Sequence, residues 1–296
     1  MNYCLGTVQF GLEYGIQGNG KPQREKVFEI LSYAIKNGIG ILDTASAYGE
    51  AEKVLGEYFR ENAHMLNRVG VVSKLKPDAF EKQKVDLWPE IAVKNAKESL
   101  KKIGLDRFYA YLFHNAMYIY DKSAVMALNE VKEMGLADRI GVSIYNPDEA
   151  MKALEYPQIK AIQIPYNLLD HRLDQCGFFS KAKDQGVVIF ARSSLLQGLL
   201  MMDPEHLPER VSFAKDYLKT FQSLCRQYNS LPLNTAIGYV GNKEGIDYIV
   251  FGVDNINQLK EYISMKESKL NEELVVEIEK TFEKVEEKLV NPVLWK

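Results

Sequence analysis

The chain has 296 residues, of which 46% are hydrophobic and 26% are charged, as in ordinary globular proteins with a large core. A formal net charge of -3 gives no electrostatic basis for binding nucleic acid or an anionic membrane. The three cysteines Cys4, Cys176 and Cys225 lie far apart, which favours free thiols in a reducing compartment over disulfides or a zinc site. The N-terminus lacks a signal-peptide pattern and no stretch approaches about 18 uncharged apolar residues, so a cytoplasmic location is expected.

Short apolar segments typical of buried strands alternate along the chain with helical patterns. Strands are expected at 3–8, 40–45, 69–75, 108–114, 139–145, 161–167, 187–193 and 247–253. Apolar residues at helical spacing predict helices over 24–37 and 122–134, each followed by a glycine, and Asn146-Pro147 starts another helix. An extra helix is expected near 208–229, before the last strand, and a tail helix near 271–289.

Eight strand-then-helix units predict an α/β fold of the (β/α)8 barrel type, in one domain over residues 1–296. A doubly wound sheet is the competing architecture, although no G-x-G-x-x-G motif follows the first strand. The C-terminal ends of all strands in such a barrel open on one face, where active sites are found. Residues that end different strands are therefore expected to converge at this mouth.

Four residues near the ends of the predicted strands combine into a set for proton transfer. Asp43 and Tyr48 lie in ILDTASAYG (41–49), Lys74 lies in VGVVSKL (69–75), and His114 closes FYAYLFH (108–114). A tyrosine hydroxyl has a pKa of about 10, which a neighbouring ammonium lowers. With a carboxylate to hold the lysine and a histidine to orient a carbonyl oxygen, the set can protonate a carbonyl as a hydride arrives. Taken singly, each residue also has a structural explanation, such as turn capping for Asp43.

Around these motifs the chain resembles the aldo-keto reductases, bacterial members included, over nearly all of its length. The matching stretches are LGTVQFG (5–11), LDTASAYGEAEKVLG (42–56), SKL (73–75), ESLKKIGLDRFYAYLFH (98–114), GVSIYN (141–146), QIPYNLLD (163–170), ARSSLLQGLL (191–200) and FGVDNINQL (251–259). The resemblance implies an NAD(P)H-dependent oxidoreductase that reduces an aldehyde or ketone to an alcohol. It implies that Tyr48 is the general acid, that Lys74 depresses its pKa and pairs with Asp43, and that His114 orients the substrate carbonyl.

The same resemblance implies cofactor contacts at several strand ends. Gly6 and Thr7 match positions near the nicotinamide, and Ser143 and Gln163 match ligands of its carboxamide. Arg192 stands where many relatives stack an aromatic ring, and a guanidinium plane can also stack. The structural alternatives are a backbone partner for Gln163 and a salt bridge at the rim for Arg192. The full set of implied contacts is Gly6, Thr7, Asp43, Ser143, Gln163, Arg192, Ser193, Leu195, Gly252, Asp254 and Gln258.

The choice of cofactor depends on the segment after the last strand. Relatives that prefer NADP carry Lys or Arg there, because a 2′-phosphate favours cationic partners, but no cation occurs between 248 and 259. Asp254 could accept from ribose hydroxyls, or Asp254-Asn255 could cap the next helix. The asparagine that commonly follows Ser143 is Ile144 here, which removes one amide contact. NADP and NAD are both candidates, and a tilt towards NADH is the hypothesis.

Loops at the same mouth are expected to form the substrate pocket. Candidates are the loop EYGIQGNGKPQ (13–23), the segment near Trp88, Tyr166 with Asn167, and the 197–212 insertion; Tyr14 and Tyr118 could form an aromatic wall. The chain ends soon after its tail helix, which predicts an open mouth for a bulky polar substrate such as a sugar-derived carbonyl compound.

Two other functions stay open from the sequence. A cofactor-binding redox sensor or auxiliary subunit with little turnover would carry the same residues. An isomerase or aldolase barrel would need a phosphate site, to which ARSSLLQG and FGVDN show only a loose resemblance. No motif for metal catalysis or a nucleophilic serine occurs, so no metal is expected. The expected partner is a small carbonyl compound, with no nucleic acid and no membrane, and the sequence leaves the oligomeric state open.

Overall fold

The computed structural model describes residues 1–16, 18, 20–266 and 269–295. Its centre is a closed barrel of eight parallel strands that pair in sequence order, with β8 returning to β1. The strands are β1 (Tyr3–Gly6), β2 (Ile41–Asp43), β3 (Gly70–Leu75), β4 (Ala110–Phe113), β5 (Ile140–Ser143), β6 (Ile159–Pro165), β7 (Val188–Arg192) and β8 (Tyr248–Phe251). The predicted (β/α)8 barrel is confirmed, and the competing doubly wound sheet is wrong.

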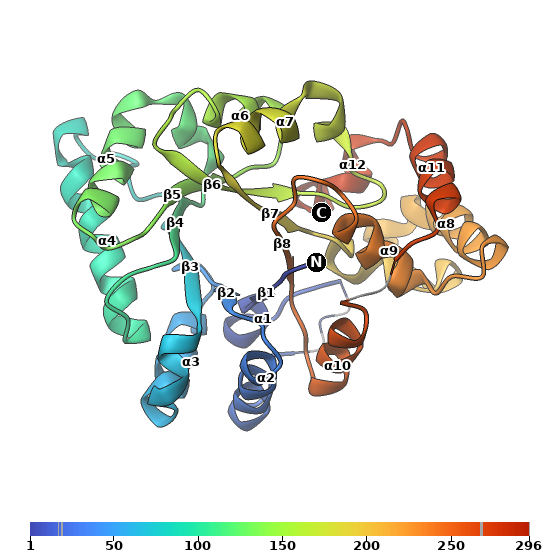
Figure 1. Ribbon diagram of the computed structural model, residues 1–296, viewed down its shortest axis with the longest axis horizontal. Helices are drawn as coiled ribbons and strands as arrows, with labels where there is room; N and C mark the ends of the chain where they lie inside the picture. The colour runs from blue at the N-terminus through green and yellow to red at the C-terminus, as the bar shows by residue number, and fades with distance from the viewer. Residues whose placement is uncertain (17, 19, 267–268, 296) are drawn as a thin grey trace.

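Helices surround the barrel, as Figure 1 shows. They are α1 (Val8–Gly11), α2 (Arg24–Lys36), α3 (Ala51–Glu61), α4 (Trp88–Ile103), α5 (Lys122–Glu133), α6 (Pro147–Ala153), α7 (Phe178–Asp184), α8 (Lys215–Gln227), α9 (Pro232–Gly241), α10 (Ile256–Ser264), α11 (Glu272–Thr281) and α12 (Glu287–Val290). Among the described residues, no helix is long and apolar enough to cross a membrane.

The strands are shorter than the apolar segments that predicted them. The first strand stops at Gly6, because Thr7 turns out of the extended conformation (φ -113, ψ 9) and Val8 begins α1. The fourth strand begins at Ala110, and Phe108 forms an isolated bridge to Ala137. An apolar segment therefore marks where a strand is, while turns at its two ends set its length.

Three of the predicted helical features are confirmed as α2, α5 and the start of α6, where Asn146 and Glu149 form a capping box. The extra helix expected near 208–229 is α8, preceded by a 3₁₀ turn at Glu209–Ala214. The tail helix expected near 271–289 is present as α11 but is shorter, because Phe282 leaves helical geometry (φ -109, ψ 23) and the chain turns helical again only at α12. Phe282 and Leu289 are both buried, so tertiary packing outweighs their shared helical spacing.

Two groups of buried side chains build the core. One fills the barrel interior and consists of Cys4, Ile41, Val72, Ala110, Leu112, Ala161, Phe190 and Val250. The other, much larger, packs the outer faces of the strands against the helices. All three cysteines are free thiols, of which Cys4 and Cys225 are buried and Cys176 is partly exposed.

Candidate active site

The predicted site residues lie on the inward face of the barrel, at the C-terminal ends of its strands. Asp43, Lys74 and His114 each stand two residues beyond a member of the interior cluster on the same strand. Since successive strand residues alternate between faces, this step keeps a side chain inside the barrel and moves it towards the mouth. The same step from interior residues of four other strands leads to Gly6, Gln163 and Arg192, and to Gly252 one residue beyond β8. Alternation on a closed barrel therefore brings these separate segments together.

Lys74 forms the centre of the proton-transfer set. Its Nζ donates hydrogen bonds to Asp43 Oδ1 at 2.8 Å and to the carbonyl oxygen of Thr44 at 2.9 Å, and it lies 3.4 Å from Tyr48 Oη. The side chains of Lys74 and Asp43 are only 1% and 5% exposed. All three ammonium protons thus have an acceptor, which is the condition for burying a lysine.

The loop that carries Tyr48 is fixed by close backbone packing. A Cβ atom at Gly11 would lie 1.8 Å from the carbonyl oxygen of Tyr48, so only glycine allows α1 to lie against this loop. Gly49 has a φ of +54° and also lies against Gly11. On the other side, Ser46 Oγ donates to the carbonyl oxygen of Lys74 at 3.0 Å. This role of Gly11 was not expected from the sequence, although the residue lies within the motif LGTVQFG.

Burial and charge act in opposite directions on Tyr48 and Lys74. Burial raises the pKa of Tyr48, and the ammonium of Lys74 opposes this by favouring the phenolate. The net direction is upward, opposite to the expectation that Lys74 makes this tyrosine more acidic than usual. Burial lowers the pKa of Lys74, but Asp43 and Tyr48 outweigh it, so the net pKa is raised. Tyr48 therefore holds its proton at neutral pH, beside a charged lysine.

His114 completes the set as a neutral imidazole. Its ring packs edge-on against Tyr48, with centroids 5.7 Å apart and planes at 90°. Burial, with the nearby charges of Lys74 and Arg192, lowers the pKa of His114 to about 3. Its Nδ1 is buried and has no hydrogen-bond partner among the described residues. An uncharged imidazole in this place can bind a carbonyl oxygen without adding a positive charge to the site.

Three predicted cofactor residues are connected directly to Asp43. Gln163 Nε2 donates to Asp43 Oδ1 at 2.8 Å, and Gln163 Oε1 accepts from Ser143 Oγ at 3.3 Å. Thr7 Oγ1 donates to the carbonyl oxygen of Asp43 at 3.0 Å, while Gly6 pairs with Asp43 in the sheet. The backbone partner considered for the Gln163 side chain is wrong, because its amide joins Ser143 to Asp43.

Arg192 lies above the loop that follows β5. Its guanidinium is 4.6 Å from the centroid of the Tyr145 ring, and Nη2 donates to the carbonyl oxygen of Ile144 at 2.8 Å. Nη1 donates to Ser193 Oγ at 3.1 Å. The rim salt bridge considered for Arg192 is wrong, because it forms no ion pair with any residue that the structure describes. Ile144 is buried, and what it offers to the site is the backbone carbonyl oxygen that accepts from Arg192.

The segment after β7 has an unusual backbone. Ser193, Leu196 and Gln197 have φ values of 62°, 47° and 56°, in the left-handed region that side chains rarely adopt. Leu195 lies between them, partly buried against the core. Ser194 Oγ is buried without a hydrogen-bond partner in the described part of the chain. Such strain and such unsatisfied groups concentrate at ligand sites.

Gly252 provides a cradle at the end of β8. A Cβ atom there would lie 2.2 Å from Gln9 Oε1, so a side chain at this position would displace Gln9. Gln9 Oε1 is itself buried and unpartnered among the described residues. Together with Ser194 Oγ, it leaves polar atoms for a ligand that extends along the mouth. The residues present therefore fit an extended polar cofactor such as a dinucleotide.

The residues after β8 are partly engaged in local turns. Asn255 caps α10 by accepting from the backbone N–H groups of Asn257 and Gln258. Gln258 Oε1 accepts from the backbone N–H of Asp254 at 2.7 Å. The capping interpretation is thus confirmed for Asn255, and Gln258 uses its amide oxygen to shape the loop.

The expected substrate loops separate into two groups. Tyr14 lies near Tyr48 and Arg192, and its pKa is raised, chiefly because its hydroxyl is buried while the residue as a whole is 41% exposed. The insertion contacts the same loop, since Ile16 N–H donates to the Gln197 carbonyl oxygen at 3.3 Å. Gln17 and Asn19 of the loop 13–23 lie outside the described residues.

The other substrate candidates have structural roles. Tyr166 is buried, donates to Asp174 and stacks on Tyr239. Asn167 is fully buried and accepts from two backbone N–H groups of its own turn. Tyr118 and Trp88 pack on Phe80, and Tyr118 Oη accepts from the Phe80 N–H at 3.1 Å. Of the two tyrosines expected to form an aromatic wall, Tyr14 remains a candidate. Tyr118 does not, because its ring packs on Phe80.

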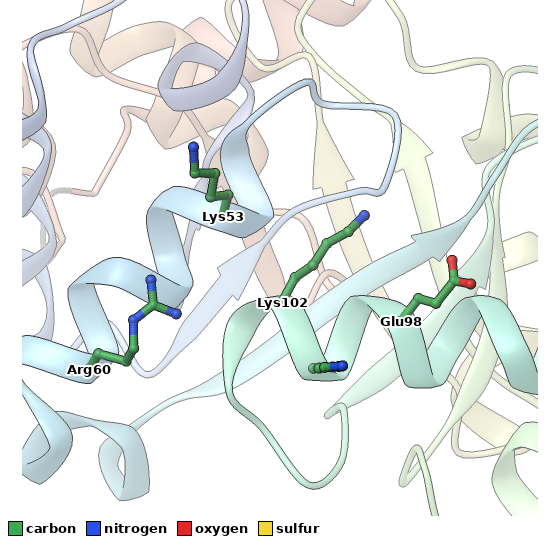
Figure 2. Close-up of a pocket in the computed structure, with 5 residues that line it drawn as sticks. Lys53, Arg60, Glu98 and Lys102 are labelled. Carbon is green, nitrogen blue, oxygen red and sulfur yellow. The ribbon is translucent and has the colours of Figure 1, made fainter.

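A groove on the outer surface lies apart from this mouth. It runs between α3 and α4 and is lined by long charged side chains (Figure 2): Lys53, Arg60, Glu98, Lys101 and Lys102. None of the four proton-transfer residues lines it. Within the described residues, no group of His, Cys, Asp and Glu could hold a metal ion.

The barrel and its mouth define a class of protein before any relative is considered. It is a closed parallel (β/α)8 barrel with a buried Lys74–Asp43 pair at the C-terminal ends of its strands, where the active sites of such barrels are found. The sequence model described as "Aldo/keto reductase family" matches residues 2–283. The chain therefore belongs to the aldo/keto reductase family.

Relatives share low identity with the chain over most of its length. It is 25% identical to the NADH-specific methylglyoxal reductase of Escherichia coli, covering 88% of each chain. It is 24% identical to probable aldo-keto reductase 1 of Glycine max, covering 93% of this chain and 86% of that protein. Among solved structures, an aldo-keto reductase of Bacillus halodurans in its holo form superposes with a TM-score of 0.76 at 22% identity, covering 94% and 91% of the two chains. That structural likeness supports the fold.

Proposed function

We propose that the protein is an NAD(P)H-dependent carbonyl reductase in which Tyr48 is the general acid. The observation that carries the proposal is the contact of Tyr48 Oη with Lys74 Nζ at 3.4 Å, within the buried pair that Lys74 forms with Asp43. Reduction needs a proton donor that keeps its proton at neutral pH and tolerates losing it during the reaction. Tyr48 meets both conditions, since burial raises its pKa and the adjacent ammonium stabilises the phenolate that forms.

Each residue has a defined part in this mechanism. The reduced nicotinamide supplies the hydride that adds to the carbonyl carbon. Tyr48 gives its proton to the carbonyl oxygen, which completes the alcohol and leaves a phenolate beside Lys74. Asp43 keeps Lys74 charged and aimed at Tyr48, and neutral His114 directs the carbonyl oxygen towards the phenol. A proton from solvent then restores Tyr48.

Ser143, Gln163 and Arg192 are proposed to hold the nicotinamide end of the cofactor. The hydroxyl of Ser143 and the amide of Gln163 suit hydrogen bonds to a carboxamide, and the guanidinium plane of Arg192 lies at the same mouth. Gly6, Thr7, Ser193, Leu195 and Gly252 line the path along the ends of β1, β7 and β8, with Asp254 and Gln258 beyond. Ser194 Oγ and Gln9 Oε1, which have no hydrogen-bond partner among the described residues, are proposed as further polar contacts, and neither was expected from the sequence as a contact.

The proposed cofactor is NADH in preference to NADPH. No Lys or Arg stands between 248 and 259, so a 2′-phosphate lacks cations from this segment. The Escherichia coli relative, by its name, is NADH-specific. Titrating the protein with each cofactor and following tryptophan fluorescence measures both Kd values. A Kd for NADPH well below that for NADH would contradict the preference and leave carbonyl reduction untouched.

The decisive experiment follows the loss of NADH or NADPH absorbance with a panel of aldehydes and ketones, including sugar-derived carbonyl compounds and small dicarbonyls. Tyr48→Phe should lower turnover by about 10²–10⁴-fold, because it removes the proton donor, while cofactor affinity stays near that of wild type. Tyr120→Phe is the matched control, since Tyr120 is 45% exposed and is not one of the proton-transfer residues. Tight cofactor binding without turnover would instead favour the redox sensor or auxiliary subunit.

The panel also tests the substrate class. A sugar-derived carbonyl is the proposed substrate, with the partly exposed ring of Tyr14 available for stacking at the mouth. Turnover of small dicarbonyls with poor activity on sugar-derived compounds would contradict this substrate and preserve the reductase.

A further inference from the structure

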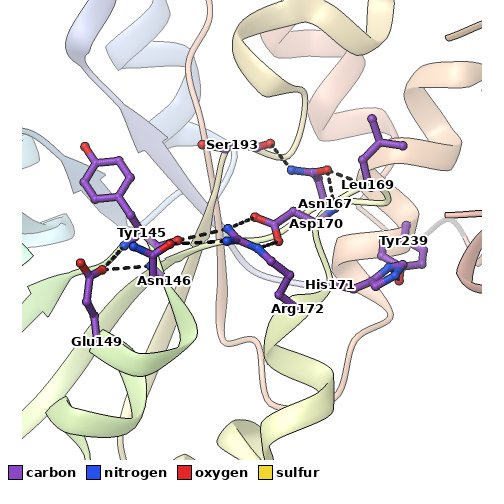
Figure 3. A network of polar contacts seen from close by, with 10 residues as sticks. All are labelled: Tyr145, Asn146, Glu149, Asn167, Leu169, Asp170, His171, Arg172, Ser193 and Tyr239. Carbon is purple, nitrogen blue, oxygen red and sulfur yellow. Dashed lines mark hydrogen bonds and ion pairs between the residues drawn. The ribbon is translucent and has the colours of Figure 1, made fainter. Parts of the chain in front are cut away.

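Arg172 lies in the loop after β6 and makes contacts that are unusual for a loop arginine. Its Nε and Nη2 donate to Asp170 Oδ1 and Oδ2 at 2.7 and 3.0 Å. Nη2 also donates to the Tyr145 carbonyl oxygen at 3.2 Å, and Nη1 to Asn146 Oδ1 at 3.4 Å. Figure 3 shows the guanidinium between the loop after β5 and the turn that contains Asp170. Its planar fork allows both sets of bonds at once, which a lysine cannot reproduce.

The bonds from Arg172 to the loop after β5 lead to Arg192. Arg172 holds the backbone of Tyr145, whose ring lies 4.6 Å below the Arg192 guanidinium. The preceding residue, Ile144, accepts from Arg192 Nη2 through its carbonyl oxygen. The same short segment is therefore gripped by Arg172 on one side and supports Arg192 on the other.

The bonds from Arg172 to Asp170 lead to Arg192 by another route, through its C-terminal neighbour Ser193. Asp170 is buried, with its side chain 2% exposed, and its backbone N–H donates to Asn167 Oδ1 at 3.0 Å. Asn167 Nδ2 in turn donates to the carbonyl oxygen of Ser193 at 3.2 Å (Figure 3). Ser193 is one of the residues with positive φ and accepts from Arg192 Nη1. Both supports of Arg192 thus end at the pair formed by Arg172 and Asp170.

We propose that Arg172 is a positioning residue that fixes Arg192 for the cofactor by joining the loops after β5, β6 and β7. The inference rests on the proposed function, in which Arg192 faces the nicotinamide. Arg172 is not a contact in that scheme, since four hydrogen bonds engage its guanidinium with Asp170, Tyr145 and Asn146. Its effect therefore passes through Arg192.

This role predicts a particular pattern of kinetic change. Arg172→Met should raise the cofactor Kd about tenfold, the factor expected for loss of a hydrogen bond to a charged group, with a smaller change in kcat. Arg172→Lys should fall between Met and wild type, because the charge remains and the fork is lost. In an Arg192→Met background, Arg172→Met should add little further loss, since the residue it positions is gone.

The experiment compares wild type, Arg172→Met, Arg172→Lys, Arg192→Met and the double variant. Cofactor Kd, kcat and unfolding by denaturant are measured for each. Arg107→Met is the matched control, because it removes an exposed ion pair to Asp138 at 3.5 Å on another part of the surface. Independent, additive effects of Arg172→Met and Arg192→Met on Kd would overturn the proposal, as would an effect of Arg107→Met equal to that of Arg172→Met.

A second readout needs neither turnover nor cofactor binding. Crystal structures of wild type and Arg172→Lys without cofactor should show Arg192 shifted from the Ile144 carbonyl oxygen in the variant. Arg192 remaining in its wild-type place would overturn the positioning role. Failure of wild type to bind either cofactor would instead remove the proposed function, and the crystal comparison would still decide whether Arg172 fixes Arg192.

Discussion

The ends of β2, β3 and β4 hold their polar groups differently from the loops after β5 to β8. On the first side, Lys74 contacts both Asp43 and Tyr48 directly, and the side chains of Lys74 and Asp43 are almost without solvent. On the second side, Arg192 and Ser193 depend on a chain of partners that runs through partly exposed loops. The first side thus holds the preformed ion pair of Lys74 and Asp43, and the second side holds Arg192 on a surface that neighbouring loops support.

The difference matches the two tasks of the proposed reaction. Proton transfer needs a donor fixed to within a fraction of an ångström, which short buried contacts provide. A cofactor must enter and leave, so its contacts lie on loops that can open locally. Mutations on the first side should therefore change stability and turnover together. Mutations on the second side should act mainly on cofactor affinity.

Breaking the buried ion pair should have the largest effect. Lys74→Met leaves the Asp43 carboxylate buried with Gln163 as its remaining side-chain donor, which should lower the free energy of unfolding by about 3–5 kcal/mol. Unfolding in guanidinium chloride at pH 7 measures the change. The double variant Asp43→Asn with Lys74→Met should recover much of the loss, because no uncompensated charge remains.

An exposed ion pair of similar length provides the control. Lys183 Nζ lies 2.7 Å from Glu244 Oε1, against 2.8 Å from Lys74 Nζ to Asp43 Oδ1, but the Lys183 and Glu244 side chains are 68% and 84% exposed. Lys183→Met should cost less than about 1 kcal/mol. Equal losses in Lys74→Met and Lys183→Met would show that burial does not set the value of the pair, and the contrast between the two sides of the mouth would fail.

Adding one methyl group beside Tyr48 should have the next largest effect. Gly11→Ala places a Cβ atom against the Tyr48 carbonyl oxygen, so the loop must move, at a cost of about 1–3 kcal/mol in stability. Turnover should fall further than stability alone explains, because Tyr48 shifts from Lys74. Gly40→Ala is the matched control, since its Cβ would meet only the Arg68 carbonyl oxygen, at 3.9 Å. Unchanged turnover in Gly11→Ala would show that this packing does not place Tyr48.

The sequence allowed the barrel and the four residues to be predicted, because both follow from local signals. Alternation places Asp43, Lys74 and His114 on one face of neighbouring strands, and the chemistry of each is visible in its residue type. The bond from Gln163 to Asp43 joins residues 120 positions apart, so no local pattern encodes it. The raised pKa of Tyr48 depends on the depth of burial, which also follows only from the assembled fold.

The pH dependence of stability should reveal the buried neutral histidine. The pKa of His114 is about 3 in the folded chain, against 6.5 for an ordinary histidine, so below pH 6.5 the unfolded chain takes up a proton that the folded chain does not. The contribution of His114 to the free energy of unfolding is therefore fully present above pH 6.5. It is lost as the pH falls towards 3, at up to about 1.4 kcal/mol per pH unit.

Denaturant unfolding at pH 7.5 and 5.5 measures this loss. Wild type should lose more stability on acidification than His114→Gln, in which the titrating ring is absent. His64→Gln, which changes an exposed histidine, is the matched control and should keep the wild-type pH dependence. Equal losses of stability in wild type and His114→Gln would mean that His114 takes up its proton in the folded chain. That result would contradict the lowered pKa of His114.

Loss of a helix cap on the cofactor side should have the smallest effect. Asn255→Ala removes the acceptor for the backbone N–H groups of Asn257 and Gln258 and should cost about 1 kcal/mol. Because Gln258 also holds the backbone of Asp254, the loop after β8 should loosen and the cofactor Kd should rise a few fold, with kcat unchanged. Asn271→Ala removes the corresponding cap of α11 and should cost similar stability without changing Kd. A lower kcat in Asn255→Ala, at saturating cofactor, would show that the cofactor loops and the proton-transfer side act as one unit, which contradicts the division drawn between them.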